Sequence, residues 1–103
     1  MHKKPIASGY KRTGVDAATA TGSLLPPALI ASGNLPVVTV RYVELQAEAQ
    51  AIRYTLDGST PTATNGLRLA VGEIVTLTPA QLAVLQVISE TAGAFANAQA
   101  YSA

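Results

Sequence analysis

The chain has 103 residues, of which 49% are hydrophobic and only 13% are charged, and its net charge is +1. This length predicts a single domain, and because soluble domains usually contain ~25% charged residues, the low charge favours assembly into a larger complex. The sequence has no cysteine and one histidine, His2, which excludes disulfides and thiolate metal sites and leaves almost no base for a nucleophilic serine or threonine.

The N-terminal segment is basic, whereas the rest of the chain is mildly acidic. Residues 1–12 carry four Lys or Arg and no Asp or Glu, and the remaining residues carry three Arg and six Asp or Glu. Frequent Gly and Pro predict irregular backbone as far as residue 36. We therefore predict an extended irregular arm over residues 1–22 and one folded domain over residues 23–103. The candidate partner-binding residues of the arm are Lys3, Lys4, Tyr10, Lys11 and Arg12.

Three roles of this arm remain open from the sequence. It could be a solvated tail, it could dock on an acidic surface of a neighbouring protein, or it could contact nucleic acid. Four positive charges support only weak phosphate binding, and one aromatic residue, Tyr10, is not a stacking platform, so nucleic acid is the least favoured partner. Tyr10 suits a pocket in a protein partner better. Deletion of residues 1–22 is then expected to leave a folded domain that no longer binds its assembly.

The apolar segment at residues 24–30 is interrupted by Pro26 and Pro27. Proline has no N–H group to donate to a sheet, so this segment is predicted to be an edge or an ordered arm rather than a central strand. We expect it to lie across a surface of this chain or of a partner. Its candidate partner-binding residues are Leu24, Leu25, Leu29 and Ile30.

From residue 37 the sequence alternates as strands do. β-Branched and aromatic residues predict strands at 37–47, 52–56, 67–71, 74–77, 84–89 and 95–101. Thr78 followed by Pro79 predicts the start of one short helix. Short strands at this spacing predict an all-β fold, a small β-sandwich or barrel. Core packing is the expected role of four large aromatic residues, Tyr42, Tyr54, Phe95 and Tyr101.

The loop at residues 57–66 begins with Asp57-Gly58 and ends with Asn65-Gly66, which are both turn signals. Its hydroxyl groups can bond nearby backbone N–H groups and stiffen it, which suits a contact surface or a glycan-facing surface. A calcium site usually needs several carboxylates, and this loop has one. We predict no catalytic, cofactor-binding or metal-binding residue, and no enzyme activity. The candidate contact residues of the loop are Asp57, Ser59, Thr60, Pro61 and Thr62.

The segment Ile52–Val71, with the sequence IRYTLDGSTPTATNGLRLAV, resembles a hairpin of small virion structural proteins of tailed bacteriophages. It is also similar, more weakly, to a hairpin of the C-terminal β-sandwich of chitobiase-type glycosidases. The matching residues are Tyr54, Thr55, Asp57, Gly58, Ser59, Pro61 and Thr62. The resemblance implies an all-β fold and a virion setting, and it implies no particular site.

Within virions, the small β proteins that this hairpin resembles serve as capsid decoration (cement) proteins, as bases of head fibres or as parts of the tail. The predicted extended arm and compact domain favour a decoration protein, which binds the outer shell and stabilises contacts between capsid subunits. The expected partners are the major capsid protein or other virion proteins, with this chain as a dimer or trimer, made in the host cytoplasm. No apolar run approaches the ~18 residues of a membrane helix, so we expect no membrane contact. The alternative is a tail- or fibre-associated adhesin or a carbohydrate-binding β-sandwich module. A glycan-binding module is expected to show two or three exposed coplanar aromatic residues.

Overall fold

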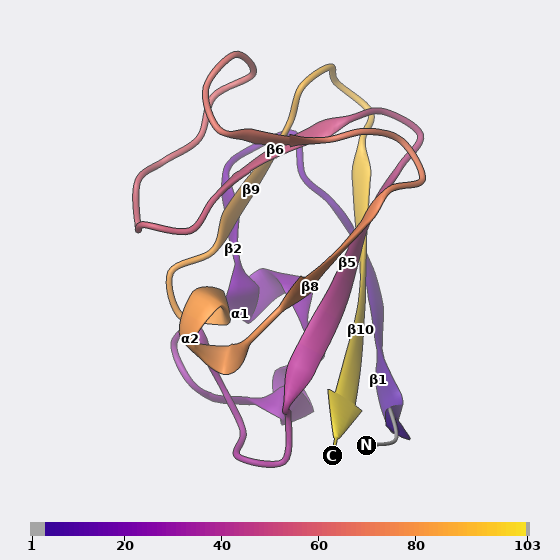
Figure 1. Cartoon of the computed structure of the whole chain (residues 1–103), viewed down its shortest axis with the longest axis vertical. Helices are drawn as coiled ribbons and strands as arrows, with labels where there is room; N and C mark the ends of the chain where they lie inside the picture. Colours follow the sequence, from indigo (N-terminus) through magenta and orange to yellow (C-terminus); the bar gives the residue numbers. More distant parts are fainter. Residues whose placement is uncertain (1–3, 103) are drawn as a thin grey trace.

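Two antiparallel four-stranded sheets face each other, which confirms the all-β prediction and decides for a sandwich over a barrel. The computed structural model describes residues 4–102. We call the sheet with the order β1-β10-β5-β8 the long sheet and the sheet with the order β2-β9-β6-β7 the short sheet. Figure 1 shows both layers, and the first and last described residues, Lys4 and Ser102, pair with each other at the end of the long sheet.

The long sheet contains the longest strands of the fold. Its strands are β1 (Lys4–Gly14), β10 (Phe95–Ser102), β5 (Tyr42–Glu48) and β8 (Ile74–Leu77). β10 and β5 pair without interruption from Phe95↔Glu48 to Tyr101↔Tyr42. β5 begins later than the predicted start at residue 37, because a turn closed by the Val40 N–H and the Val37 carbonyl (3.0 Å) precedes it.

The short sheet covers the other side of the core. Its strands are β2 (Thr19–Ala20), β9 (Gln86–Ser89), β6 (Ile52–Thr55) and β7 (Leu67–Leu69). A separate hairpin is formed by β3 (Ile30–Ser32) and β4 (Leu35–Pro36). Of the predicted strands after residue 50, every one is present, and its ends agree within two residues.

The predicted helix is present as α2 (Pro79–Leu82), with Thr78 as its N-cap. The Thr78 N–H donates to Gln81 Oε1 (2.9 Å) and the Gln81 N–H donates to Thr78 Oγ1 (3.4 Å), which completes a capping box. The prediction of a single helix was wrong, because α1 (Thr21–Leu24) and the 3-10 turn η1 (Pro27–Leu29) are also helical. Thr, Gly and Ser favour helix weakly, so tertiary packing rather than propensity forms α1.

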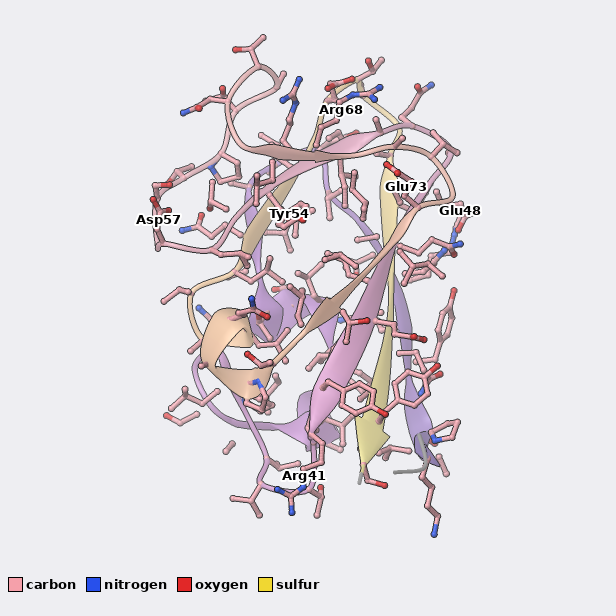
Figure 2. The ribbon with its side chains drawn as sticks, in the orientation of Figure 1. Arg41, Glu48, Tyr54, Asp57, Arg68 and Glu73 are labelled. Atoms are coloured by element: carbon pink, nitrogen blue, oxygen red, sulfur yellow. The ribbon has the colours of Figure 1, made fainter. Side chains whose placement is uncertain are left out.

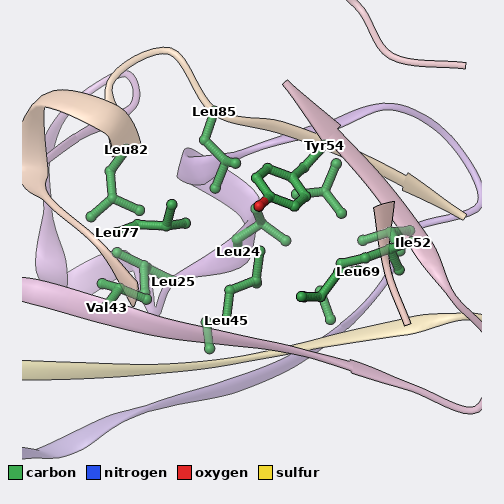
Figure 3. Packing of buried hydrophobic residues seen from close by; sticks show 14 of the residues in the cluster. Leu24, Leu25, Val43, Leu45, Ile52, Tyr54, Leu69, Leu77, Leu82 and Leu85 are labelled. Atoms are coloured by element: carbon green, nitrogen blue, oxygen red, sulfur yellow. The ribbon is translucent and has the colours of Figure 1, made fainter. Parts of the chain in front are cut away.

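The core lies between the sheets and is built from aliphatic side chains. Leu24 of α1 and Leu82 of α2 are each 1% exposed, so the two helices close the space between the sheets at one end (Figures 1 and 3). Tyr54 is the only aromatic residue in this core among the described residues (Figure 3). Within residues 4–102, every buried side-chain nitrogen or oxygen atom has a hydrogen-bond partner.

The prediction of an irregular N-terminal arm was wrong for residues 4–14. They form β1, an edge strand that pairs with β10 at seven positions from Lys4↔Ser102 to Gly14↔Phe95. The register shifts between Pro5 and Tyr10, where Ser8 has a φ of 61°. This bulge, together with Pro5 and two lysines, protects the open edge from pairing with other strands. The Gly and Pro residues that suggested irregular backbone therefore belong to an interrupted strand.

The apolar segment at residues 24–30 is also placed differently from the prediction. Leu24, Leu25 and Leu29 are buried at 1%, 0% and 9% exposure, and Ile30 packs against the same core. The three leucines are therefore unable to contact a partner in the folded protein, whereas Ile30 is only partly buried. The segment lies outside the two four-stranded sheets, as its prolines predicted. It turns inward as α1 and η1 because its leucines fill the space beside α2, and only its last residue, Ile30, begins β3.

Candidate functional site

The outer face of the long sheet carries four of the five aromatic residues of the chain. In β10 the side chains alternate: Ala96, Ala98 and Ala100 are at most 1% exposed and point into the core. Their neighbours Phe95, Asn97, Gln99 and Tyr101 therefore point outward. The prediction that Tyr42, Phe95 and Tyr101 pack in the core was wrong, because small alanines occupy that side and leucines from other elements fill the core.

The register places the outward side chains in rows across the four strands. We call these residues the outer face. Its central rows, read from β1 to β8, are Arg12, Asn97, Gln46, Ile74 and Tyr10, Gln99, Glu44, Thr76. The flanking rows contain Phe95 with Glu48 on one side and Tyr101 with Tyr42 on the other.

A small open hollow of about 130 Å³ lies in the middle of the outer face. Its floor is polar, and Tyr10 (53% exposed) and Ile74 (56% exposed) stand on opposite sides of it. The Tyr42 and Tyr101 rings stack in the adjoining row, with their centroids 5.4 Å apart and their planes at 18°. The lining residues of the hollow are Tyr10, Glu44, Gln46, Ile74, Asn97 and Gln99.

Internal hydrogen bonds hold the polar side chains of the hollow in place. The Tyr10 hydroxyl donates to Asn97 Oδ1 (2.8 Å), and Asn97 Nδ2 donates to Glu48 Oε1 (2.9 Å). Gln46 Nε2 donates to the Gly72 carbonyl (3.2 Å), and Gln99 Nε2 donates to the Ala100 carbonyl (2.9 Å). A face fixed in this way loses little side-chain freedom when a ligand binds.

Arg12 is bound within the outer face. Its guanidinium contacts both carboxylate oxygens of Glu48 (2.9 and 3.1 Å) and lies 3.6 Å from the centroid of the Phe95 ring. The hydrogen bond from Arg12, followed by the bond from Asn97, lowers the pKa of Glu48. Arg12 was predicted to bind a partner, but its charge is used here to fix the edge of the outer face.

A second surface lies at the lower end of the molecule in Figure 2, where Arg41 is labelled. The Arg41 N–H donates to the Tyr101 carbonyl (2.8 Å), and the next residue of β10, Ser102, pairs with Lys4. In the turn that precedes Arg41, the Val38 side chain is 92% exposed. We call the surface formed by Lys4, Val38 and Arg41 the basic end.

The described residues carry six cations and six anions, so their formal charges balance, but the two signs differ in how they are used. Each of the six Asp and Glu residues accepts a hydrogen bond within the protein. Arg12, Arg53 and Arg68 form ion pairs with Glu48 or Glu90. The cations that form no ion pair with another described residue are Lys4, Lys11 and Arg41, two of them at the basic end.

The loop at residues 57–66 contains short-range hydrogen bonds of the kind that the sequence predicted. Asp57 Oδ1 accepts the Ser59 N–H (3.0 Å), and Thr62 and Asn65 exchange two backbone hydrogen bonds (2.9 and 3.2 Å). The Ser59 hydroxyl and N–H lower the pKa of the Asp57 carboxyl. Asp57, Ser59, Thr60 and Thr62 are exposed, whereas Pro61 is buried. An open hollow of about 510 Å³ lies beside this loop and β6 (Figure 2).

The predicted site residues are thus separated by the fold. Tyr10 and Arg12 belong to the outer face, Lys4 to the basic end, and Lys11 to the edge of β1. Lys3 lies outside the described residues. The loop residues lie elsewhere on the surface, and the structure brings none of them to the outer face (Figure 2). The sequence analysis did not identify Gln46, Asn97 or Gln99 as site residues. The strict alternation of alanine with larger side chains in β10 could have indicated that Asn97 and Gln99 share one face of the strand.

Two searches for other kinds of site gave negative results over the part of the chain that the structure describes. Residues 4–102 contain no cluster of three or more His, Asp or Glu side chains that could hold a metal ion. None of the helices in this range has the length and apolar character needed to cross a membrane. Comparison with protein-family models, curated proteins and solved structures finds no match for this chain.

Acid is expected to destabilise the fold. Hydrogen bonds from the Gly93 N–H and then the Ser89 hydroxyl lower the pKa of Asp16, and Arg68 and Arg53 lower that of Glu90. A carboxyl whose pKa is lower in the folded state contributes stability above its unfolded pKa and loses it as pH falls through the folded pKa. The free energy of unfolding should therefore decrease progressively below about pH 5. Urea unfolding at a series of pH values measures this decrease. Asp16→Asn should make the free energy of unfolding depend less steeply on pH. An unchanged pH dependence in this variant would contradict the role of Asp16.

Proposed function

We propose that this chain is a non-enzymatic virion structural protein, a capsid decoration protein that docks on the outer shell of a tailed bacteriophage through its basic end. The observation that carries the proposal is that Lys4 and Arg41 form no ion pair with another described residue and lie at the same end of the molecule as the exposed Val38. A docking surface of this kind suits an acidic surface with a small apolar depression. The hairpin that resembles small phage virion proteins supports the setting.

The shape of the molecule is consistent with such a role. Its extents are 34 × 24 × 22 Å, and the basic end occupies one tip of the longest axis (Figures 1 and 2). A domain that docks by a tip projects the remainder of its surface away from the shell. The contact area of one tip is small, so dimers or trimers of the chain would raise the overall affinity by multivalency.

Co-sedimentation with empty capsids of the phage that encodes this chain tests the proposal. We expect saturable binding at a fixed ratio to the major capsid protein, and weaker binding at high salt because exposed charges are screened. Arg41→Gln should reduce the affinity about tenfold, in the range of a charged contact at an interface. The bound ratio at saturation would also give the symmetry site.

Arg68→Gln is the matched control, because it removes the same charge from the opposite end of the molecule (Figure 2). Arg68 is 53% exposed in its ion pair with Glu90, so its loss should change stability by less than about 1 kcal/mol and leave capsid binding intact. If both variants bind as tightly as the parent protein, the basic end is not the docking surface. If the parent protein stays in the supernatant, the decoration proposal fails.

A further inference from the structure

We propose that the hollow on the outer face of the long sheet binds an uncharged saccharide. The proposed contacts are Tyr10, Gln46, Ile74, Asn97 and Gln99, which line the hollow. This surface is separate from the basic end, and a chain docked through that end would present the hollow away from the shell. The inference therefore stands or falls independently of the proposed function.

The first argument is the cost of placing aromatic side chains on this surface. A sandwich ordinarily turns its large apolar side chains toward the core and its polar side chains toward water. Here β10 does the reverse, with alanines at 0–1% exposure inside and Phe95 and Tyr101 outside. Tyr10 in the neighbouring strand is 53% exposed. An arrangement that leaves these rings outside the core suits a surface that contacts a ligand.

The second argument is the order of polar and apolar groups across the outer face. At the centre, two neighbouring rows on β10 and β5 present amide and carboxylate side chains. These residues are Asn97 with Gln46 and Gln99 with Glu44. Apolar groups, Tyr10 and Ile74, stand at the sides of this centre. Protein–protein interfaces usually have the opposite order, an apolar centre with a polar rim. A ligand rich in hydroxyl groups with apolar ring faces matches a polar floor between apolar walls.

The third argument is hydrogen-bonding capacity. An amide side chain has two N–H donors and an oxygen acceptor, and Gln46 and Gln99 each use one N–H for a backbone carbonyl. Those bonds fix the two amides while leaving further donors and acceptors at the floor of the hollow. Hydroxyl groups, which donate and accept, can pair with both kinds of group.

The fourth argument is charge. The described residues of the outer face include two carboxylates, Glu44 and Glu48, and one guanidinium, Arg12, which is already paired with Glu48. None of the described residues that line the hollow is a Lys or Arg, which an anionic polymer would need as partners, and this favours an uncharged ligand. The volume of about 130 Å³ is below the several hundred Å³ of most small-molecule sites, so the hollow suits one sugar ring at a time.

The test is a titration of the ¹⁵N-labelled full chain, followed by NMR, with four uncharged probes and one anionic probe. The uncharged probes are cellohexaose, maltohexaose, hexa-N-acetylchitohexaose and a mannan oligosaccharide, and the anionic probe is a heparin hexasaccharide. At least one uncharged probe should shift the signals of Gln46, Asn97 and Gln99, including their side-chain amides. The proposal is overturned if no uncharged probe causes shifts there, if the shifts occur only at residues 57–66, or if only the heparin fragment binds.

Variants locate the site. Tyr10→Ala should weaken binding of the responding probe about tenfold, in the range expected for loss of an aromatic contact, and Gln99→Ala should weaken it similarly. Tyr10→Phe keeps the ring and removes only the hydroxyl that donates to Asn97, so it should bind more tightly than Tyr10→Ala. Arg41→Gln, at the basic end, is the control that should bind as the parent protein does. Equal binding by Tyr10→Ala, with an unchanged melting temperature, would overturn the assignment.

Discussion

Deletion of residues 1–22 is expected to unfold this protein, not to leave a folded domain that has lost only its binding surface. The deletion removes β1, which pairs with β10 at seven positions, and it removes Val15 and Thr21, both 0% exposed. Val15 also joins the two sheets, because its carbonyl accepts the Ser89 N–H (2.7 Å) and its N–H donates to the Ala94 carbonyl (3.3 Å). Small domains are stable by only ~5–15 kcal/mol, so we expect the loss of an entire strand and two buried residues to unfold the chain.

Circular dichroism and thermal unfolding measure this outcome directly. The truncated chain should show no cooperative transition and should lose its dispersed NMR spectrum. Deletion of residues 1–3 alone is the control, since it removes none of the pairs named above. A truncated chain beginning at residue 23 that melts cooperatively would show that β1 is a dispensable arm, as the sequence suggested.

Leu25→Ala should lower the free energy of unfolding by about 2–5 kcal/mol, because it leaves a cavity where a leucine is 0% exposed. The sequence presented Leu25 as a partner-binding residue, so this variant separates the two interpretations. A surface leucine removed from the folded protein would affect partner binding and leave stability nearly unchanged. Urea unfolding with a linear extrapolation provides the measurement.

Leu35→Ala is the matched control for this prediction. Leu35 is 51% exposed in β4, and exposed substitutions usually change stability by no more than about 0.5 kcal/mol. The same chemical change in two leucines ten positions apart in the sequence therefore has expected effects that differ severalfold. Similar effects at both positions would mean that α1 and η1 are not packed as the structure shows.

The two proposed surfaces depend on different features of the fold. The basic end is formed by a turn and two strand ends, Lys4 of β1 and Arg41 just before β5, that are remote in sequence. The outer face depends on the register of four strands. Both proposed surfaces include residues of β1, so the N-terminal segment contributes to them as part of the folded domain rather than as an extended arm.

The sequence determined the local structure wherever a strong pattern is independent of its surroundings. Alternation predicted the strands after residue 50, and the Thr78-Pro79 pair predicted α2 with its capping box. The Asp57-Gly58 and Asn65-Gly66 pairs predicted a stiff loop. The capping box and the loop are fixed by hydrogen bonds within a few residues. The strands pair with distant segments, but the alternation that predicts them is itself a local pattern.

Only the tertiary structure decided which side of each strand faces the core. The alternation in β10 is symmetrical in the sequence, since either the alanines or the large side chains could have been buried. The leucines of α1, α2 and β5 fill the core, and the remaining space admits only alanine, so the aromatic residues are outside. The same packing draws Leu24 and Leu25 inward and aligns β1 with β10. The outer face is thus a consequence of core volume and strand register. Both depend on contacts between residues that are far apart in the sequence, which a local sequence pattern does not reveal.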